Sequence, residues 1–106
     1  MINIDGVQAF GFFEEGEYGY VSDKLEDMAK MGLFGIDLPA FFERLETLEF
    51  GLSSAYVTNA FTGKKIRRGI YEDGKFCFPS DYVQYLKEGR VGFPAEYAAY
   101  LKTQGF

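Results

Sequence analysis

The sequence predicts a single α+β domain over residues 1–106, in which helices pack on an antiparallel sheet of about five strands. Three observations predict this class. Strand-like and helix-like segments come in separate groups, the length suits one core, and 47% of the residues are hydrophobic. Because 19% of the residues are aromatic, a chain of this size has more rings than its core can enclose, and we expect some at the surface. The expected order is two strands, two helices, three strands and two helices.

The first two predicted strands form a hairpin. Residues 7–13 and 18–21 are rich in Phe, Tyr and Val, which favour extended structure. Residues 14–17, with the sequence EEGE, are typical of a turn between them.

Two helices are predicted next. The first begins after Ser22 and Asp23, both good N-cap residues, and ends at Gly32. The second begins at Asp37, has an early proline and ends at Gly51. Its apolar face consists of Leu38, Phe41, Phe42, Leu45 and Leu48.

A meander of three strands follows. Residues 54–61 and 66–71 are the first two strands, and Thr62-Gly63-Lys64 forms the turn between them. Asp73-Gly74 is a strong hairpin signal, and it leads into the third strand, residues 75–78.

The last part of the chain contains a duplicated pattern, FPSDYVQYLKEG at residues 78–89 and FPAEYAAYLKTQG at residues 93–105. Each copy predicts a helix that begins at a proline and ends at a glycine, and the two copies form a helical hairpin. In each helix two tyrosines and a leucine at i, i+3 and i+4 share one face. We expect this face to pack in the core. The alternative is an aromatic cleft between the helices that binds a base or a peptide, formed by Tyr82, Tyr85, Tyr97 and Tyr100.

Several chemistries are excluded by residue type. The chain has no His and one Cys, which removes His-dependent catalysis and the usual zinc and iron–sulfur ligand sets. No phosphate-binding glycine motif and no calcium-loop pattern occurs. We therefore expect no cofactor, no metal and no enzymatic activity. Cys77, which lies between Phe76 and Phe78 on a strand, is expected to be buried on the face opposite to both rings.

Charge is divided unequally along the chain. Residues 1–50 carry eleven acidic and three basic side chains, whereas residues 51–106 carry five acidic and eight basic ones. We expect an acidic surface made by Glu14, Glu15, Glu17, Glu26, Asp27, Glu43, Glu46 and Glu49. A basic cluster on the second hairpin consists of Lys64, Lys65, Arg67 and Arg68, with Tyr56, Phe61 and Tyr71 nearby. We do not expect it to bind nucleic acid, because the cluster is small and the net charge is −5.

These observations favour a small non-catalytic protein-binding module, an inhibitor or regulator whose acidic and aromatic surface contacts a basic surface of another protein. Small acidic inhibitors of nucleic-acid-handling enzymes, such as phage anti-restriction and anti-CRISPR proteins, have a similar composition. A small-ligand-binding protein, or an enzyme that uses carboxylates and tyrosines, is the alternative. Self-association through the oppositely charged halves is a third hypothesis. Without a membrane-spanning or signal segment in the sequence, we expect a cytoplasmic location.

Overall fold

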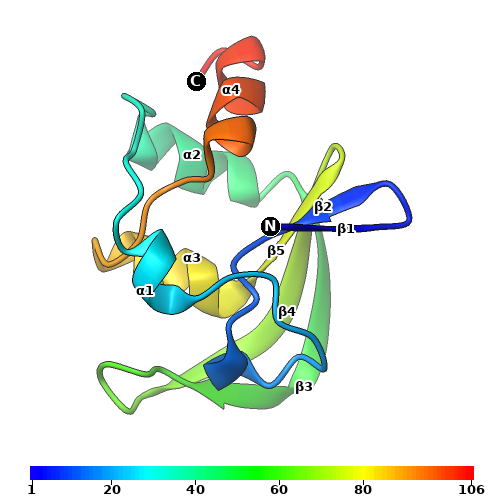
Figure 1. Cartoon of the computed structure of the whole chain (residues 1–106), viewed down its shortest axis with the longest axis vertical. Helices are drawn as coiled ribbons and strands as arrows, with labels where there is room; N and C mark the ends of the chain where they lie inside the picture. Colours follow the sequence, from blue (N-terminus) through cyan, green and yellow to red (C-terminus); the bar gives the residue numbers. More distant parts are fainter.

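The computed structural model describes all residues, 1–106, and has five strands in one sheet, with helices α2, α3 and α4 on one side of it (Figure 1). The strands are β1 (Ile2–Ile4), β2 (Val7–Ala9), β3 (Glu49–Thr58), β4 (Lys65–Asp73) and β5 (Phe76–Pro79). The helices are α1 (Leu25–Met28), α2 (Leu38–Leu45), α3 (Ser80–Lys87), α4 (Ala95–Thr103) and the short 3₁₀ helix η1 (Glu14–Gly16). The predicted α+β class is confirmed.

The sheet has the strand order β1-β2-β5-β4-β3, and one of its pairings is parallel. Gln8 pairs with Phe76 and Ala9 with Cys77 in parallel, whereas all other neighbouring strands are antiparallel. The prediction of a wholly antiparallel sheet was therefore wrong at this point. Parallel strands need a long crossover connection, and here most of the chain lies between β2 and β5.

The first hairpin lies earlier in the chain than predicted. It joins β1 to β2 through Asp5 and Gly6, which have φ of 50° and 87°, the left-handed values that a two-residue type I′ turn requires. The predicted turn instead contains η1, and Phe10, Phe12 and Phe13 are buried outside any strand. These rings look like part of a strand in the sequence, but they enter the core from an irregular segment.

Helix α2 begins as predicted but ends sooner. The Asp37 carboxylate accepts a hydrogen bond from the Ala40 amide at 3.2 Å, which confirms the N-cap. The helix ends at Leu45, and Glu49 already pairs with Glu72 across β3 and β4. The predicted helix end at Gly51 was wrong because residues 49–51 gain strand hydrogen bonds, and the Phe50 ring stacks on Tyr71 at 4.4 Å.

The expected N-cap of the first helix was also wrong. Lys24 occupies the N-cap position of α1 and makes no capping hydrogen bond through its side chain. Asp23 instead accepts hydrogen bonds from the N-terminal amine, the Gly11 amide and the Ser22 hydroxyl. Its carboxylate therefore joins the N-terminus to the segment after β2.

The duplicated pattern forms two core helices. Tyr82 and Tyr97 are completely buried, and their rings contact Phe78 at 5.8 and 5.4 Å. The helices do not form the predicted hairpin. Helix α3 packs on β4 and β5, whereas α4 lies at one end of the molecule (Figure 1). Both copies thus pack a tyrosine of their aromatic stripe against Phe78 of β5.

A smaller apolar cluster occupies the other face of β5. Cys77 packs there with Ala9 and Phe12, while Phe76 and Phe78 belong to the main core. The predicted burial of Cys77 opposite to its two neighbours is confirmed. Burial raises the pKa of the Cys77 thiol above its usual value, which keeps it protonated and unreactive at neutral pH.

Gly92 lies in the loop between α3 and α4 and contacts the loop after α1. Replacing it by Ala is expected to lower the free energy of unfolding by about 1–3 kcal/mol. A Cβ at this position would lie 2.1 Å from the Met31 carbonyl oxygen and 2.5 Å from that of Gly32. Both are backbone atoms, and the Gly92 amide donates a hydrogen bond to the Met28 carbonyl, so the loops have little freedom to separate. Urea unfolding measures the loss. Gly63→Ala is no control for this effect, because its φ of 73° adds strain. Gly32→Ala is the control, because its φ is not left-handed and a Cβ there would meet nothing closer than the Phe34 amide nitrogen at 4.0 Å.

Candidate protein-binding site

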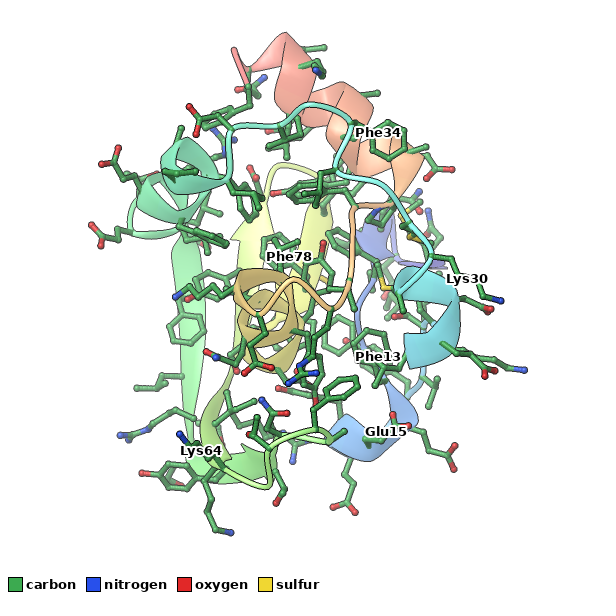
Figure 2. All side chains as sticks on the ribbon, turned by 90° about the vertical axis from the view of Figure 1, so that its left-hand side faces the viewer. Phe13, Glu15, Lys30, Phe34, Lys64 and Phe78 are labelled. Carbon is green, nitrogen blue, oxygen red and sulfur yellow. The ribbon has the colours of Figure 1, made fainter.

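The acidic residues fall into two groups on different sides of the molecule. Glu14 and Glu15 on η1 and Glu26 on α1 lie around a surface hollow. Glu43 projects from α2, Glu46 follows that helix and Glu49 begins β3. In Figure 2 η1 and α1 lie at the right of the molecule and α2 at the left, with α3 between them. The structure therefore brings only part of the predicted acidic surface together, because the chain crosses the molecule between α1 and α2.

The hollow beside η1 has a volume of about 600 Å³, within the range of ligand-binding pockets. Its apolar part includes Val21 and Phe61, whose side chains remain about half exposed. The complete lining consists of Glu14, Glu15, Val21, Asp23, Lys24, Leu25, Glu26, Ala29 and Phe61. We call this the η1 hollow. Its carboxylates outnumber its single lysine, so it offers a cation both negative charge and apolar contact.

Buried neighbours hold η1 in place. Phe13, directly before it, is buried against the Tyr85 ring at 6.0 Å. Gly16 at its end packs so closely on Tyr18 and Asp81 that a Cβ there would lie 2.8 and 2.9 Å from their side-chain atoms. Glu14 and Glu15 lie between these two anchors and remain exposed to solvent.

The other predicted acidic residues of this region have different surroundings. Glu17 and Asp27 are exposed but do not line the η1 hollow, and the Glu17 carbonyl accepts a hydrogen bond from Arg68. Asp23 does line it, although it was not among the residues of the predicted acidic surface. Its charge is largely balanced by the N-terminal amine at 2.5 Å, so the free charge of the hollow comes from the glutamates.

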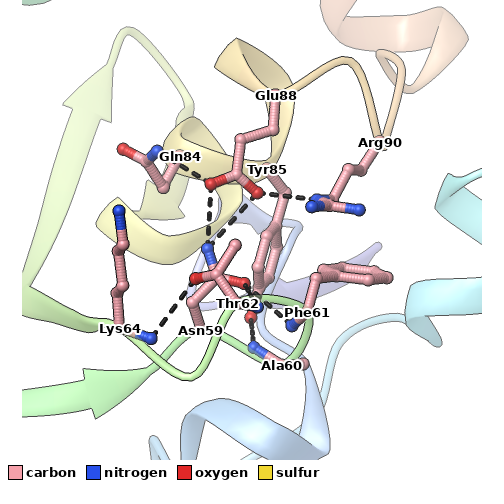
Figure 3. A network of polar contacts seen from close by, with 9 residues as sticks. All are labelled: Asn59, Ala60, Phe61, Thr62, Lys64, Gln84, Tyr85, Glu88 and Arg90. Carbon is pink, nitrogen blue, oxygen red and sulfur yellow. Dashed lines mark hydrogen bonds and ion pairs between the residues drawn. The ribbon is translucent and has the colours of Figure 1, made fainter.

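Phe61 is carried by a loop that a buried asparagine organises (Figure 3). The Asn59 side-chain oxygen accepts hydrogen bonds from the Phe61 amide at 2.9 Å and the Thr62 amide at 3.2 Å. Its side-chain nitrogen donates to the Glu88 carboxylate at 3.0 Å. The Ala60 amide donates to the Tyr85 hydroxyl, which fastens the same loop to α3. Side-chain bonds from Asn to nearby amides are a common way to stabilise such turns.

The Phe61 ring is fixed on both sides although it is 48% exposed. It packs edge-on against Tyr85 at 5.3 Å, and the Arg90 guanidinium lies 4.1 Å from its centre. Glu88 accepts hydrogen bonds from Gln84 and from Arg90, and these bonds lower the pKa of Glu88 below its usual value. Sequence reasoning named Phe61 only as a neighbour of the basic cluster and missed the network that holds it. No local pattern joins residues 59, 88 and 90.

The predicted basic cluster is divided between different surroundings. Lys64 lies in the loop before β4, while Lys65 and Arg67 begin the strand and are exposed. Arg67 lies 5.7 Å from the Tyr56 ring. Arg68 points to the opposite face and lies over the Tyr18 ring at 4.3 Å. Two of the four cations therefore contact the protein's own rings.

The four tyrosines of the duplicated pattern do not line an open cleft. Tyr82, Tyr85 and Tyr97 are buried, and only Tyr100 is partly exposed. The Tyr82 hydroxyl donates to the Gly92 carbonyl at 2.9 Å, and the Tyr97 hydroxyl donates to Asp73 at 2.6 Å. Burial raises the pKa of all three buried phenols above the usual value. Their hydroxyl groups satisfy internal partners, as expected for core tyrosines.

Two further features of the structure bear on ligands and membranes. No group of three or more Asp, Glu, Cys or His side chains is arranged to hold a metal ion. None of the helices has the length and apolar character needed to cross a bilayer.

The chain matches no protein family, and neither curated proteins nor solved structures gave a match.

Proposed function

We propose that this chain is a small non-catalytic protein-binding module, an inhibitor or regulator that receives a basic segment of its partner in the η1 hollow. One observation carries the proposal: Glu14, Glu15 and Glu26 surround an apolar hollow beside an exposed phenylalanine whose position is fixed. Charge and apolar contact thus occur at one place.

The arrangement suits a lysine or arginine side chain of a partner. Its charged end would lie among the glutamates, and its aliphatic part would pack on Val21 and Phe61. Large aromatic side chains dominate the energetics of many interfaces, and a ring that is already fixed loses little entropy on binding. The net charge of −5 would steer a basic partner toward the chain.

A nucleic-acid-binding groove is the partner surface that we propose. Such grooves carry many lysines and arginines, and a protein that covers them blocks access to phosphates. The support for this narrower proposal is the charge of the η1 hollow together with the acidic composition of the chain.

Reversing the charges of the η1 hollow is expected to weaken partner binding by at least about 100-fold, or about 2.7 kcal/mol. The variant is Glu14→Lys/Glu15→Lys/Glu26→Lys. Its control is Glu43→Lys/Glu46→Lys/Glu96→Lys, which changes the net charge equally at exposed residues away from the η1 hollow. The partner is captured from lysate of the native host with the tagged chain, at low and high salt, and its affinity is then measured by calorimetry. Equal losses in both variants would show that net charge acts without a site.

Phe61→Ala separates the apolar contact from charge. Phe34→Ala is its matched control, because Phe34 is 49% exposed and lies away from the η1 hollow. We expect a loss of binding with the first variant only, with circular dichroism showing that both variants fold. Unchanged affinity in Phe61→Ala would contradict the aromatic part of the proposal.

The volume of the η1 hollow also favours a second candidate, the binding of a small cationic molecule. A ligand that binds only the folded state raises the unfolding temperature. Thermal unfolding with a panel of amines, metabolites and metal ions tests this candidate. Stabilisation that disappears in the Glu14→Lys/Glu15→Lys/Glu26→Lys variant would favour it over the protein partner.

A further inference from the structure

Strand β3 is an uncovered edge of the sheet. It has ten residues, whereas β1 at the opposite edge has three. From Phe50 to Thr58 it contains no charged residue and no proline, and all but two of its residues are exposed. Edge strands are usually protected by charges, prolines or short length, because their outward N–H and C=O groups can pair with another strand. β3 has none of these three protections, and a bulge at its centre is the one protective device of an edge strand that it carries.

An apolar stripe runs along one face of this edge. Phe50, Leu52 and Tyr56 are 39, 55 and 54% exposed. They pair with alternate residues of β4, namely Tyr71, Gly69 and Arg67, and therefore share one face. Figure 2 shows β3 as the outermost strand at the left, beyond α3. The stripe lies on the same face of the sheet as the helices but extends beyond them, so no helix covers it.

A bulge lies at the centre of β3. Between Leu52 and Tyr56 the strand has three residues opposite a single residue of β4. These three, Ser53, Ser54 and Ala55, have small side chains, and the Ser53 oxygens accept hydrogen bonds from Ala55 and Arg67. The bulge thus leaves two regular segments, residues 49–52 and 56–58, on either side of a compact centre.

The two ends of β3 carry opposite charge. Glu49 lies beside Glu72 at one end, and Thr58 lies beside Lys65, with Lys64 in the adjoining loop, at the other. If a second copy is placed antiparallel on a two-fold axis through the bulge, each acidic end lies against a basic end. Residues 50–52 then oppose 56–58 of the second copy, and Glu49 lies beside Asn59 of that copy. Such an arrangement is self-complementary, as a two-fold interface must be.

We propose that β3 is a dimerisation edge, at which two copies of this chain pair antiparallel and join their sheets. A two-fold axis perpendicular to the sheet leaves both apolar stripes on the same face, so that Leu52 of each copy packs near Tyr56 of the other. The assembly stops at two copies because β1 offers only three residues for further pairing. The interface residues do not include Phe61 or the glutamates of the η1 hollow, so different variants test the two sites.

Sedimentation velocity over a series of protein concentrations tests the dimer. The full chain is expected to change from monomer to dimer, and hydrogen exchange is expected to show slower exchange of β3 amides in the dimer. Leu52→Lys introduces two like charges beside the two-fold axis and is expected to weaken the dimer at least about tenfold. Leu33→Lys is the matched control, because Leu33 is 40% exposed and lies in the loop before α2. This variant is expected to dimerise as the original chain does.

The charged ends are tested by a charge swap. The Glu49→Lys/Glu72→Lys variant has two basic ends and is expected to weaken the dimer, and addition of Lys64→Glu/Lys65→Glu to the same chain should restore it, because an acidic end again adjoins a basic end. Raised salt should also weaken the dimer of the chain without substitutions. A chain that remains monomeric at its highest attainable concentration would overturn the proposal. So would a dimer unaffected by Leu52→Lys, or one whose β3 amides exchange as fast as in the monomer.

Discussion

Replacing Asp73 by Ala is expected to lower the free energy of unfolding by about 3–5 kcal/mol. Asp73 is the buried last residue of β4, and its two oxygens bind the Arg44 guanidinium at 2.7 and 3.1 Å. The same carboxylate accepts a hydrogen bond from the buried Tyr97 hydroxyl. The substitution therefore leaves a mostly buried cation and a buried hydroxyl without their partner. It also loosens α2 and α4, which Asp73 connects to the sheet.

Glu72→Ala is the control for this prediction. Glu72 is the preceding residue of β4 but is exposed, and its removal should change stability by less than about 0.5 kcal/mol. Urea unfolding followed by circular dichroism measures both variants. Similar small losses in both would show that the Arg44–Asp73–Tyr97 network contributes little net stability.

Replacing Asp81 by Asn is expected to stabilise the protein at neutral pH by about 3 kcal/mol. Asp81 lies buried in the first turn of α3, and burial raises its pKa to about 6. One carboxylate oxygen and the nearby Tyr18 hydroxyl are buried without a hydrogen-bond partner. Nearby backbone amides, the Tyr18 hydroxyl and the charge of Arg68 lower the pKa, but less than desolvation raises it. At neutral pH the fold thus contains a carboxylate charge that is poorly compensated.

The sign of the pH dependence follows from these pKa values. Because the carboxyl binds its proton more tightly in the folded chain, its contribution to stability is greatest below the unfolded pKa of about 4. That contribution decreases as the pH rises toward about 6 and stays low above it. Asn cannot ionise, so the variant should lose this part of the pH dependence and match the original chain only in acid.

The duplicated pattern supplies the control for Asp81. Glu96 occupies the corresponding position of the second copy, at the start of α4, and is exposed. Glu96→Gln should change stability by less than about 0.5 kcal/mol at any pH. Urea unfolding of all three chains over the acid-to-neutral range makes the measurement. If Asp81→Asn is less stable than the original chain at neutral pH, the buried charge is better compensated than we infer.

The fold class and several element boundaries followed from the sequence because local chemistry determines them. Asp37 begins α2 through its own side chain, and Pro79 and Pro94 precede the two closing helices as predicted. The Asp73-Gly74 signal marks the hairpin from β4 to β5, in which Asp73 ends β4 and Gly74 begins the turn, and the alternation around Cys77 placed this residue opposite its aromatic neighbours. Each signal involves residues within a few positions of one another.

Much of the candidate site could not be predicted in this way. The sequence indicated Glu14, Glu15 and Glu26 but joined them with Glu43, Glu46 and Glu49, which lie on another side of the molecule. The end of α2, where strand pairing overrides helical periodicity, separates part of that second group. The network around Phe61 joins residues 59–62 to residues 84–90, and no spacing rule relates these segments.

The sequence by itself thus determined the α+β class, the core role of the apolar stripes and the chemistries that its residues exclude. The tertiary structure alone decided the parallel pairing of β2 with β5, the two-sided placement of the acidic residues and the fixed position of Phe61. The physical reason is the separation along the sequence of the residues that interact. Caps, turns and side-chain alternation depend on neighbours in the chain, whereas strand order, burial of irregular segments and convergence of charges depend on contacts between distant residues.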